Sequence, residues 1–312
     1  MHCPPQLPSS PSSLESDDGY GSGEGGKTMT MFDAKAFKQT THAQWNAVAD
    51  RWNAWAPLLD RWLGPVTETL LAMAKVGPGS RVLHVASGSG QEAMQTARRV
   101  GPSGYVLATD LSEALTALAR SNFAAAGLSN AHARVMDGED FELNEAPFDA
   151  VISRVGLIYF PDQLGAIKRQ AAALCVGGYL GAIVYATPEE CRFFSDPVGV
   201  IRRRAAIPPP APGQPGPFSL GTPGRIEELF AAAGLTDIQV RKVDAPVILE
   251  SAAECLRFEQ ESFGALHQML GKLDDAAKAA AWAEVGEKLA AFESNGKFKG
   301  PCVMIAAVGR RQ

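Results

Sequence analysis

The chain has 312 residues, of which 46% are hydrophobic and 20% charged, and its formal net charge is −5 at pH 7. This composition is typical of a folded globular protein with one large core or two modest ones. The acidic balance gives no general attraction to nucleic acid, so a small or neutral partner is favoured. Because no apolar run approaches the ~18 residues that a membrane-spanning helix needs, we expect no membrane span.

Cysteine usage and the first residues indicate where the protein works and where its fold begins. The five cysteines are spread singly, without the close pairs of metal sites or a dense disulfide pattern. This predicts a cytoplasmic protein without a metal site. Residues 1–30 are rich in Pro, Ser and Gly and lack the apolar core of a secretory signal, so they predict a disordered tail before a domain of residues 31–312. The oligomeric state stays open, with a homodimer as one alternative.

The first part of that domain is helical. Over residues 41–74, apolar and aromatic residues recur at three, four and seven positions, which indicates amphipathic helix interrupted at Pro57. Core packing is one explanation for the tryptophans in this segment, and a lid over a flat ligand is the other. The three that we expect in a lid are Trp45, Trp52 and Trp55.

Short strands then alternate with helices. The strand RVLHVA precedes a helix over Gln91–Val100, and GYVLATD precedes a helix over residues 112–126. AHARVMD ends in an acidic loop, FDAVISR precedes a helix over residues 162–175, and GGYLGAIVYA follows. Such alternation predicts a parallel sheet with helices on both faces. Its ligand should bind at the carboxyl ends of the strands, near the switch in strand order.

The regular alternation of strands and helices stops after residue 187. The insertion at residues 188–220 is too proline-rich at 207–218 for a helix or inner strand, which predicts a loop that borders the site. A helix over residues 222–235 and a strand over residues 237–247 resume the fold. A helical segment at 251–293 and a final strand at 301–311 follow, so the last two strands predict an antiparallel pair at the sheet edge.

A glycine loop ends the first strand. The segment RVLHVASGSGQEA stops at Gly88 and Gly90 and then becomes helix-forming. Glycines let the backbone turn sharply and approach a ligand, at which the following helix points its free N–H groups. The spacing Gly88-x-Gly90-x-x-Ala93 serves nicotinamide, flavin and other nucleoside cofactors alike, so it does not identify one of them.

Two carboxylates at strand ends narrow this choice. Asp110 ends the second strand, twenty residues beyond Gly90, where a carboxylate can accept hydrogen bonds from ribose hydroxyls. Asp137 ends the third strand, where it can accept a hydrogen bond from an adenine amino group while Met136 and Gly138 flank the base. A turn or helix-cap role is the alternative for Asp137.

Five segments follow one another in an order and spacing that resemble a known family: VLHVASGSG, ATDLS, VMDGEDFEL, FDAVISRVGLIYF and GGYLGAIVY. They look like the successive motifs of class I S-adenosylmethionine-dependent methyltransferases, especially the branch similar to ubiquinone and menaquinone biosynthesis methyltransferases. The resemblance covers residues 45–309. It implies an α/β, Rossmann-like sheet of seven strands in the order 3-2-1-4-5-7-6, with strand seven antiparallel and helical cap elements, and it implies S-adenosylmethionine as the cofactor.

The resemblance also implies which residues hold this cofactor. The methionine part would lie over Ser87, Gly88 and Gly90, the ribose on Asp110, and the adenine beside Leu111, Asp137 and Gly138. Ser153 and Arg154, at the end of the fourth strand, would face the sulfonium and the acceptor. Trp52 stands nearest to an aromatic position that often contacts the cofactor in this family.

His84 and Ser87 depart from the family pattern. The family usually has an acidic residue at the strand position of His84, and a cysteine at the position of Ser87. A histidine held by hydrogen bonds is favoured over a catalytic one. The lost carboxylate would weaken the hold on the methionine ammonium group.

Methyl transfer needs an oriented acceptor and the exclusion of water, which helical segments at 41–74, 188–220 and 251–293 would provide. Their apolar surface predicts a small, largely apolar or aromatic acceptor of secondary metabolism, methylated at oxygen or carbon. Candidate residues to assist the acceptor are Arg154, Tyr159 and His267, none of which the spacing singles out.

Two other functions stay open. A protein of this fold could bind S-adenosylmethionine without methyl transfer, in a structural or regulatory role or to promote a rearrangement or cyclisation; the departures at His84 and Ser87 keep this alternative. An NAD-dependent dehydrogenase would share the glycine loop and Asp110, but it explains neither Asp137 nor the terminal pair of strands.

Overall fold

The computed structural model describes residues 32–211 and 213–312, so the tail predicted for residues 1–30 lies outside the described part. Residues 33–312 pack as one unit. Among the described residues, no helix is both long enough and apolar enough to cross a membrane.

Two helices, α1 (Ala34–Ala54) and α2 (Ala56–Met73), precede the sheet. Helix α1 begins before the expected residue 41 because the Asp33 side chain accepts a hydrogen bond from the Ala36 N–H at 2.9 Å and caps the helix. The helices part at Trp55. Pro57 lies in the first turn of α2, where a proline costs no helical hydrogen bond, and this explains the predicted interruption.

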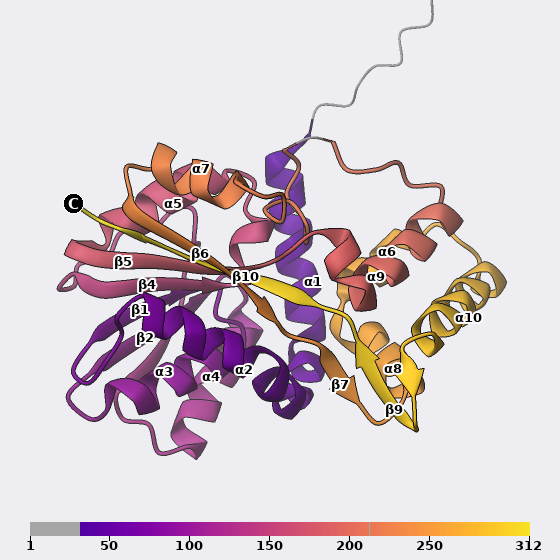
Figure 1. The fold of residues 1–312 in the computed structure, drawn as a ribbon, viewed down its shortest axis with the longest axis horizontal. Helices are drawn as coiled ribbons and strands as arrows, with labels where there is room; N and C mark the ends of the chain where they lie inside the picture. The colour runs from indigo at the N-terminus through magenta and orange to yellow at the C-terminus, as the bar shows by residue number, and fades with distance from the viewer. Residues whose placement is uncertain (1–31, 212) are drawn as a thin grey trace, which may run out of the picture. The chain divides into compact units, whose positions relative to one another are not determined.

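The main sheet has seven strands in the order β3-β2-β1-β4-β5-β10-β6 (Figure 1). Strands β1 to β5 are parallel, and β10 runs antiparallel to both β5 and β6. This confirms the predicted order, with β10 as the seventh strand. The bounds are β1 Arg81–Val85, β2 Tyr105–Asp110, β3 Ala131–Val135, β4 Phe148–Arg154, β5 Leu174–Tyr185, β6 Thr236–Asp244 and β10 Val303–Arg310.

Helices cover both faces of this sheet. Successive residues of β1 and β4 are buried, which requires cover on both sides. Helix α2 packs beside α3 (Gln91–Val100) and contacts β5 and β10, whereas α5 (Gln163–Ala172) packs beside α7 (Arg225–Ala232). Helix α4 (Glu113–Ala125) lies on β2 and β3.

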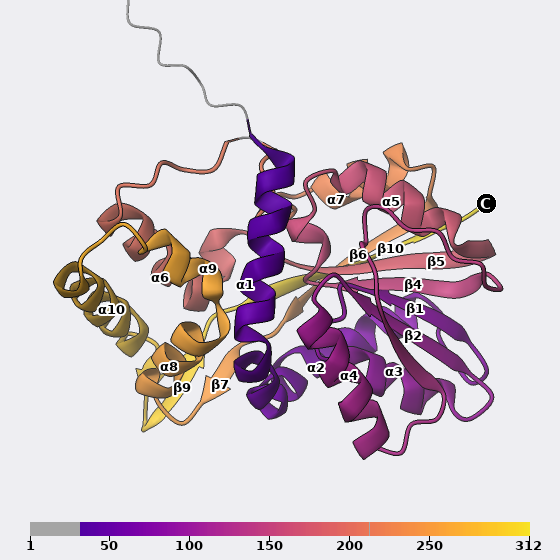
Figure 2. The same cartoon turned by 180° about the vertical axis from the view of Figure 1, so that it is seen from behind.

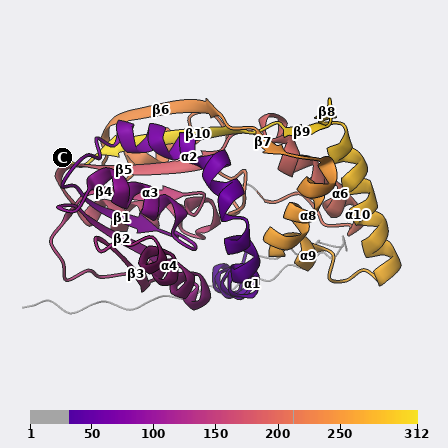
Figure 3. The same ribbon diagram turned by 90° about the horizontal axis from the view of Figure 1, so that it is seen from below.

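Beyond one end of the sheet lies a second group of elements, here called the cap (Figures 1 and 3). It consists of α6 (Arg192–Arg204), α8 (Ala252–Ser262), α9 (Gly264–Met269), α10 (Asp275–Ala290) and a small sheet of β7 (Val247–Leu249), β9 (Lys297–Gly300) and β8 (Glu293–Ser294). The prediction of a loop over residues 188–220 was wrong in its first half, which forms α6. The described residues of 207–218 do lack helix and strand. The small sheet was not predicted.

A two-stranded ribbon joins the cap to the main sheet. β6 continues into β7 and β9 continues into β10, and the two paired strands break opposite each other at Pro246 and Pro301. A proline has no N–H, so a regular ladder cannot pass through it. The Ala245 N–H still donates to the Cys302 carbonyl at 2.9 Å. The strand predicted over residues 237–247 is therefore two strands, in two sheets.

Helix α1 runs between the main sheet and the cap (Figure 2). It packs against α4 on the sheet side and against α8 and α9 on the cap side. Any ligand held at the carboxyl ends of the strands is therefore covered by α1.

Candidate active site

A pocket opens at the carboxyl ends of β1, β2, β3 and β4, beneath α1. Its empty volume is about 1060 Å³, including space open to solvent. The strand order reverses between β1 and β4, which is the position where open α/β sheets bind ligands. The loops that follow these strands and α1 supply most of the wall. Single residues of other elements complete it: Leu63 of α2, Glu92 of α3, Leu115 of α4, Tyr185 of β5, and Phe263 at the start of α9.

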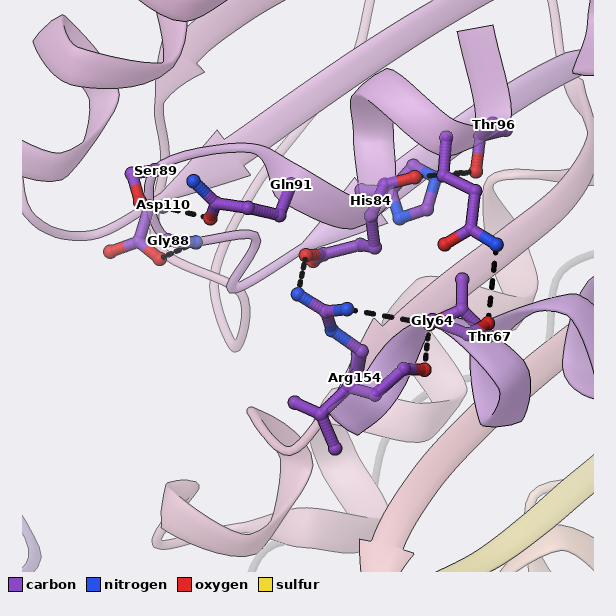
Figure 4. A network of polar contacts seen from close by, with 12 residues as sticks. Gly64, Thr67, His84, Gly88, Ser89, Gln91, Thr96, Asp110 and Arg154 are labelled. Carbon is purple, nitrogen blue, oxygen red and sulfur yellow. Dashed lines mark hydrogen bonds and ion pairs between the residues drawn. The ribbon is translucent and has the colours of Figure 1, made fainter. Parts of the chain in front are cut away.

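The glycine loop brings the backbone close to the pocket at Gly88. This residue has φ +57°, and a Cβ on it would lie 3.5 Å from the Trp52 Nε1 atom. The Gly88 N–H donates to the Asp110 carboxylate at 2.8 Å (Figure 4). The backbone is thus free of side-chain bulk at the point where Trp52 faces it.

Gly90 serves packing instead. It has φ +86°, and a Cβ would come within 2.7 Å of the Phe123 ring on α4. Gly90 does not line the pocket, in contrast to Ser87 and Gly88. Gly90 was predicted to contact the cofactor, but it packs against α4 and would support the loop instead.

We expect Gly90→Ala to lower the free energy of unfolding by about 2 kcal/mol, because it combines backbone strain with overpacking against Phe123. Gly127→Ala is a matched control, since Gly127 also has positive φ but a Cβ added to it would meet no atom within 4 Å. Urea unfolding of the two variants measures the difference. Equal losses would show that the contact with Phe123 contributes nothing.

Asp110 is held by backbone N–H groups. Its Oδ2 accepts from Gly88 at 2.8 Å, and its Oδ1 accepts from Ser112 at 2.9 Å. Burial raises the pKa of Asp110, and these two hydrogen bonds oppose that rise. The carboxylate lines the pocket. Since each oxygen has a further lone pair, it can still accept hydrogen bonds from a ligand that carries hydroxyl groups.

Asp137 lies at the outer part of the pocket. Its Oδ1 accepts from the Glu139 N–H at 3.0 Å, as in an Asx turn, and its Oδ2 lies 2.5 Å from the Lys38 Nζ on α1. Lys38 also pairs with the Glu139 carboxylate at 2.7 Å. The turn role considered for Asp137 is therefore real, and it coexists with a position in the pocket wall, which Leu111 and Gly138 share.

The tryptophans divide into two pairs. Trp45 and Trp52 line the pocket with their ring centroids 5.2 Å apart, edge to face. Trp55, which we expected in a lid, is buried in the core, where its Nε1 donates to Glu261 at 2.8 Å. Trp62 is also a core residue. Trp55 turns away from the pocket because α8 packs against it through Phe258.

The candidates predicted to face the sulfonium or the acceptor do not all line the pocket. Arg154 and Tyr159 line the pocket. Ser153 does not line it; its hydroxyl is buried and has no hydrogen-bond partner within the described chain. His267, the third candidate to assist the acceptor, lies in α9 outside the pocket wall, where its Nε2 donates to the Gln260 carbonyl at 2.6 Å and its ring packs on Trp282.

The cap contributes one residue to the wall. Phe263 lines the pocket, and no described residue of the 188–220 insertion does. The Phe194 ring of α6 lies 4.5 Å from the Phe263 ring, so the insertion supports the wall from behind.

Sequence reasoning missed Glu92. This residue lies in the first turn of α3, lines the pocket and pairs with Arg154 at 2.7 Å, with side chains that are only 3% and 5% exposed. A glutamate in the first turn of a helix is common, because it favours the helix dipole. The available signal was that the acidic residue expected at His84 is absent while Glu92 follows nearby.

His84 itself is buried next to this pair. Its Nε2 shares a hydrogen bond with the Thr96 hydroxyl at 2.9 Å, as Figure 4 shows. Burial, together with the positive charge of Arg154, lowers the pKa of His84 to about 3, so the ring is neutral at physiological pH. One ring nitrogen is thus held by a hydrogen bond, as predicted, whereas Nδ1 is buried and has no hydrogen-bond partner among the described residues.

Comparison with known proteins agrees with this geometry. Residues 82–178 match the family described as Methyltransferase domain. Together with the strand order of the sheet, these comparisons support a class I S-adenosylmethionine-dependent methyltransferase domain in this chain. S-adenosylmethionine is accordingly the cofactor, and the predicted NAD-dependent alternative is not supported.

Relatives of this methyltransferase include two curated proteins. The nocamycin O-methyltransferase of Saccharothrix syringae is 27% identical over 199 residues, which are 60% of this chain and 70% of that protein. The aklanonic acid methyltransferase DauC of Streptomyces sp. strain C5 is 30% identical over 150 residues, which are 47% of this chain and 66% of that protein. The chain spans between 49% and 70% of the lengths of the curated relatives it matches.

A solved structure shares the fold. The phosphoethanolamine N-methyltransferase 2 of Haemonchus contortus, in complex with S-adenosylhomocysteine, superimposes with a TM-score of 0.55 at 18% identity, over 90% of this chain and 60% of that one. At this identity the likeness supports the Rossmann-like fold alone.

Proposed function

We propose that the protein transfers a methyl group from S-adenosylmethionine to a small, largely apolar or aromatic acceptor, at oxygen or carbon. The observation that carries this proposal is the combination, in one pocket, of the glycine loop and Asp110 with a wall of aromatic rings. The rings of this wall belong to Trp45, Trp52, Tyr159, Phe160, Tyr185 and Phe263. The curated relatives support it, since two of them are named as methyltransferases of nocamycin and of aklanonic acid.

The residues in the pocket suit the cofactor. Asp110 has free acceptor capacity for ribose hydroxyls, and the buried Ser87 hydroxyl lies in the same pocket wall. S-adenosylmethionine supplies a methyl group bonded to a sulfonium sulfur. When the acceptor takes this methyl group, the sulfur leaves as the neutral thioether of S-adenosylhomocysteine, and this departure needs no metal or base. In our proposal the residues that hold it are Trp52, Ser87, Gly88, Asp110, Leu111, Asp137 and Gly138.

The acceptor would lie against the aromatic rings of the wall. Burial raises the pKa values of Tyr159 and Tyr185 above those of exposed tyrosines. Their hydroxyls therefore stay protonated and are suited to donate hydrogen bonds to an acceptor oxygen rather than to remove a proton. Catalysis by this wall would consist mainly of orienting the acceptor and excluding water.

An acceptor screen tests the proposal. The purified protein is incubated with S-adenosylmethionine and a panel of phenols, hydroquinones and polyketide-like keto acids, and the products are identified by mass spectrometry. We expect a methylated small molecule together with an equal amount of S-adenosylhomocysteine. Efficient methylation of a protein or tRNA, with no small acceptor, would contradict the substrate class.

Binding without methyl transfer is the second candidate, and the replacement of the usual acidic residue by His84 is the observation that favours it. It predicts tight binding of S-adenosylmethionine and no S-adenosylhomocysteine with any acceptor in the same screen. The location in the cytoplasm, the ubiquinone-like branch and a homodimer stay predictions.

A further inference from the structure

A buried ion pair lies at the inner wall of the pocket. Glu92, from the start of α3, and Arg154, from the end of β4, approach each other to 2.7 Å and are almost inaccessible to solvent. Burying such a pair is costly unless further hydrogen bonds complete both groups. Arg154 donates one of these to the Thr67 hydroxyl oxygen at 3.3 Å (Figure 4).

The Glu92 carboxylate lines the pocket and has further acceptor capacity. Arg154 is the one ion-pair partner that the described residues give it, and a carboxylate can accept about four hydrogen bonds. Burial raises the pKa of Glu92, and the adjacent guanidinium opposes this rise. Arg154 therefore favours the ionised carboxylate in a place where burial alone would neutralise it.

The position of Glu92 within the pocket suggests what it binds. Asp110 and Glu92 both line the pocket, and Ser87 and Gly88 of the glycine loop line it as well. The Ser87 hydroxyl lies beside the Glu92 carboxylate, to which it can donate a hydrogen bond. A ligand whose ribose is bound at Asp110 and which extends along the glycine loop would thus bring its other end to Glu92.

Of the ionisable groups His84, Glu92 and Arg154, which lie together, Glu92 is the only acidic one. His84, behind it on β1, is neutral and hydrogen-bonded to Thr96. The guanidinium of Arg154 is positive and would repel a cationic ligand group. The Glu92 carboxylate, which pairs with Arg154, would offset this repulsion. A carboxylate so placed is suited to an ammonium group.

We propose that Glu92 binds the α-ammonium group of the amino-acid end of S-adenosylmethionine and that Arg154 is a positioning residue that holds the Glu92 side chain in place. This rests on the proposed function. Glu92 on α3 would then supply the negative charge that the chain lacks at His84 on β1.

Three ligands separate this role from a structural ion pair. S-adenosylhomocysteine carries the ammonium, its deamino analogue lacks the ammonium alone, and methylthioadenosine lacks the whole amino-acid end. In calorimetric titrations of the unaltered protein, we expect the deamino analogue to bind about tenfold or more weakly than S-adenosylhomocysteine. Equal affinities would overturn the proposal, and this comparison requires no variant to fold.

The variant Glu92→Gln gives the second arm. We expect it to bind S-adenosylhomocysteine about tenfold or more weakly, and to bind methylthioadenosine and the deamino analogue as the unaltered protein does. The matched control is Glu68→Gln, which removes an ion pair of 2.6 Å to Arg99 outside the pocket and should change none of the affinities.

An equal loss for all three ligands in Glu92→Gln would show a purely structural pair and overturn the proposal, as would no loss at all. If the unaltered protein binds neither S-adenosylhomocysteine nor methylthioadenosine, the assignment of the cofactor site is contradicted. This result differs from equal affinities for S-adenosylhomocysteine and its deamino analogue, which would contradict only the role of Glu92.

Discussion

Replacing Trp62 by alanine should lower the free energy of unfolding by about 3–5 kcal/mol, whereas Trp52→Ala should cost about 1 kcal/mol and should impair ligand binding instead. Trp62 is 4% exposed, packs edge to face on Phe193 at 5.1 Å, and donates its N–H to the Ala245 carbonyl at 2.8 Å. Its removal leaves a cavity and an unpaired carbonyl where the ribbon passes from the sheet into the cap.

Trp52 is half-buried, and its Nε1 lies close to Gly88 in the pocket wall. Its loss should raise the dissociation constant of S-adenosylhomocysteine by about tenfold, because the ring gives contact area and cover to the site. Urea unfolding and calorimetric titration of both variants check these expectations. A large loss of stability with unchanged affinity in Trp52→Ala would show that this ring is only a core residue.

Asp110→Ala should weaken binding of S-adenosylhomocysteine by about 1.5–3 kcal/mol, because it removes charge-assisted hydrogen bonds to the ribose. The carboxylate also holds the Gly88 and Ser112 N–H groups, so the stability of the variant is measured alongside its affinity. Asp140→Ala is the control, since Asp140 is exposed, pairs with Arg169 at 3.4 Å and lies outside the pocket wall. Unchanged affinity in Asp110→Ala would refute the ribose assignment.

The sheet could be predicted because its signals are local. The first strand is a short apolar run before the glycine loop, the second ends in Asp110, and the helix over Gln91–Val100 has the predicted bounds. The strand order came from the resemblance to a family, and the structure confirms it. Local signals also placed Gly88 and Asp110, since both directly follow or end a strand.

The remaining features depend on contacts between distant segments. Trp52 and Trp55 lie three positions apart on one helical stripe, and only the packing of Phe258 against Trp55 separates a core ring from a pocket ring. Glu92 differs from an ordinary first-turn glutamate through its partner Arg154, which lies at the end of β4, 62 positions along the chain. A histidine can act as a base, which made His267 a candidate from sequence, but in α9 its ring is hydrogen-bonded to the Gln260 carbonyl of the cap.

The central claim is that the pocket at the carboxyl ends of β1 to β4 binds S-adenosylmethionine. Calorimetric titration of the purified protein with S-adenosylhomocysteine, and separately with NADH, tests it most directly. We expect S-adenosylhomocysteine to bind, with an affinity that falls in Asp110→Ala and not in Asp140→Ala, and NADH not to bind. Tight binding of NADH, with no binding of S-adenosylhomocysteine, would contradict it.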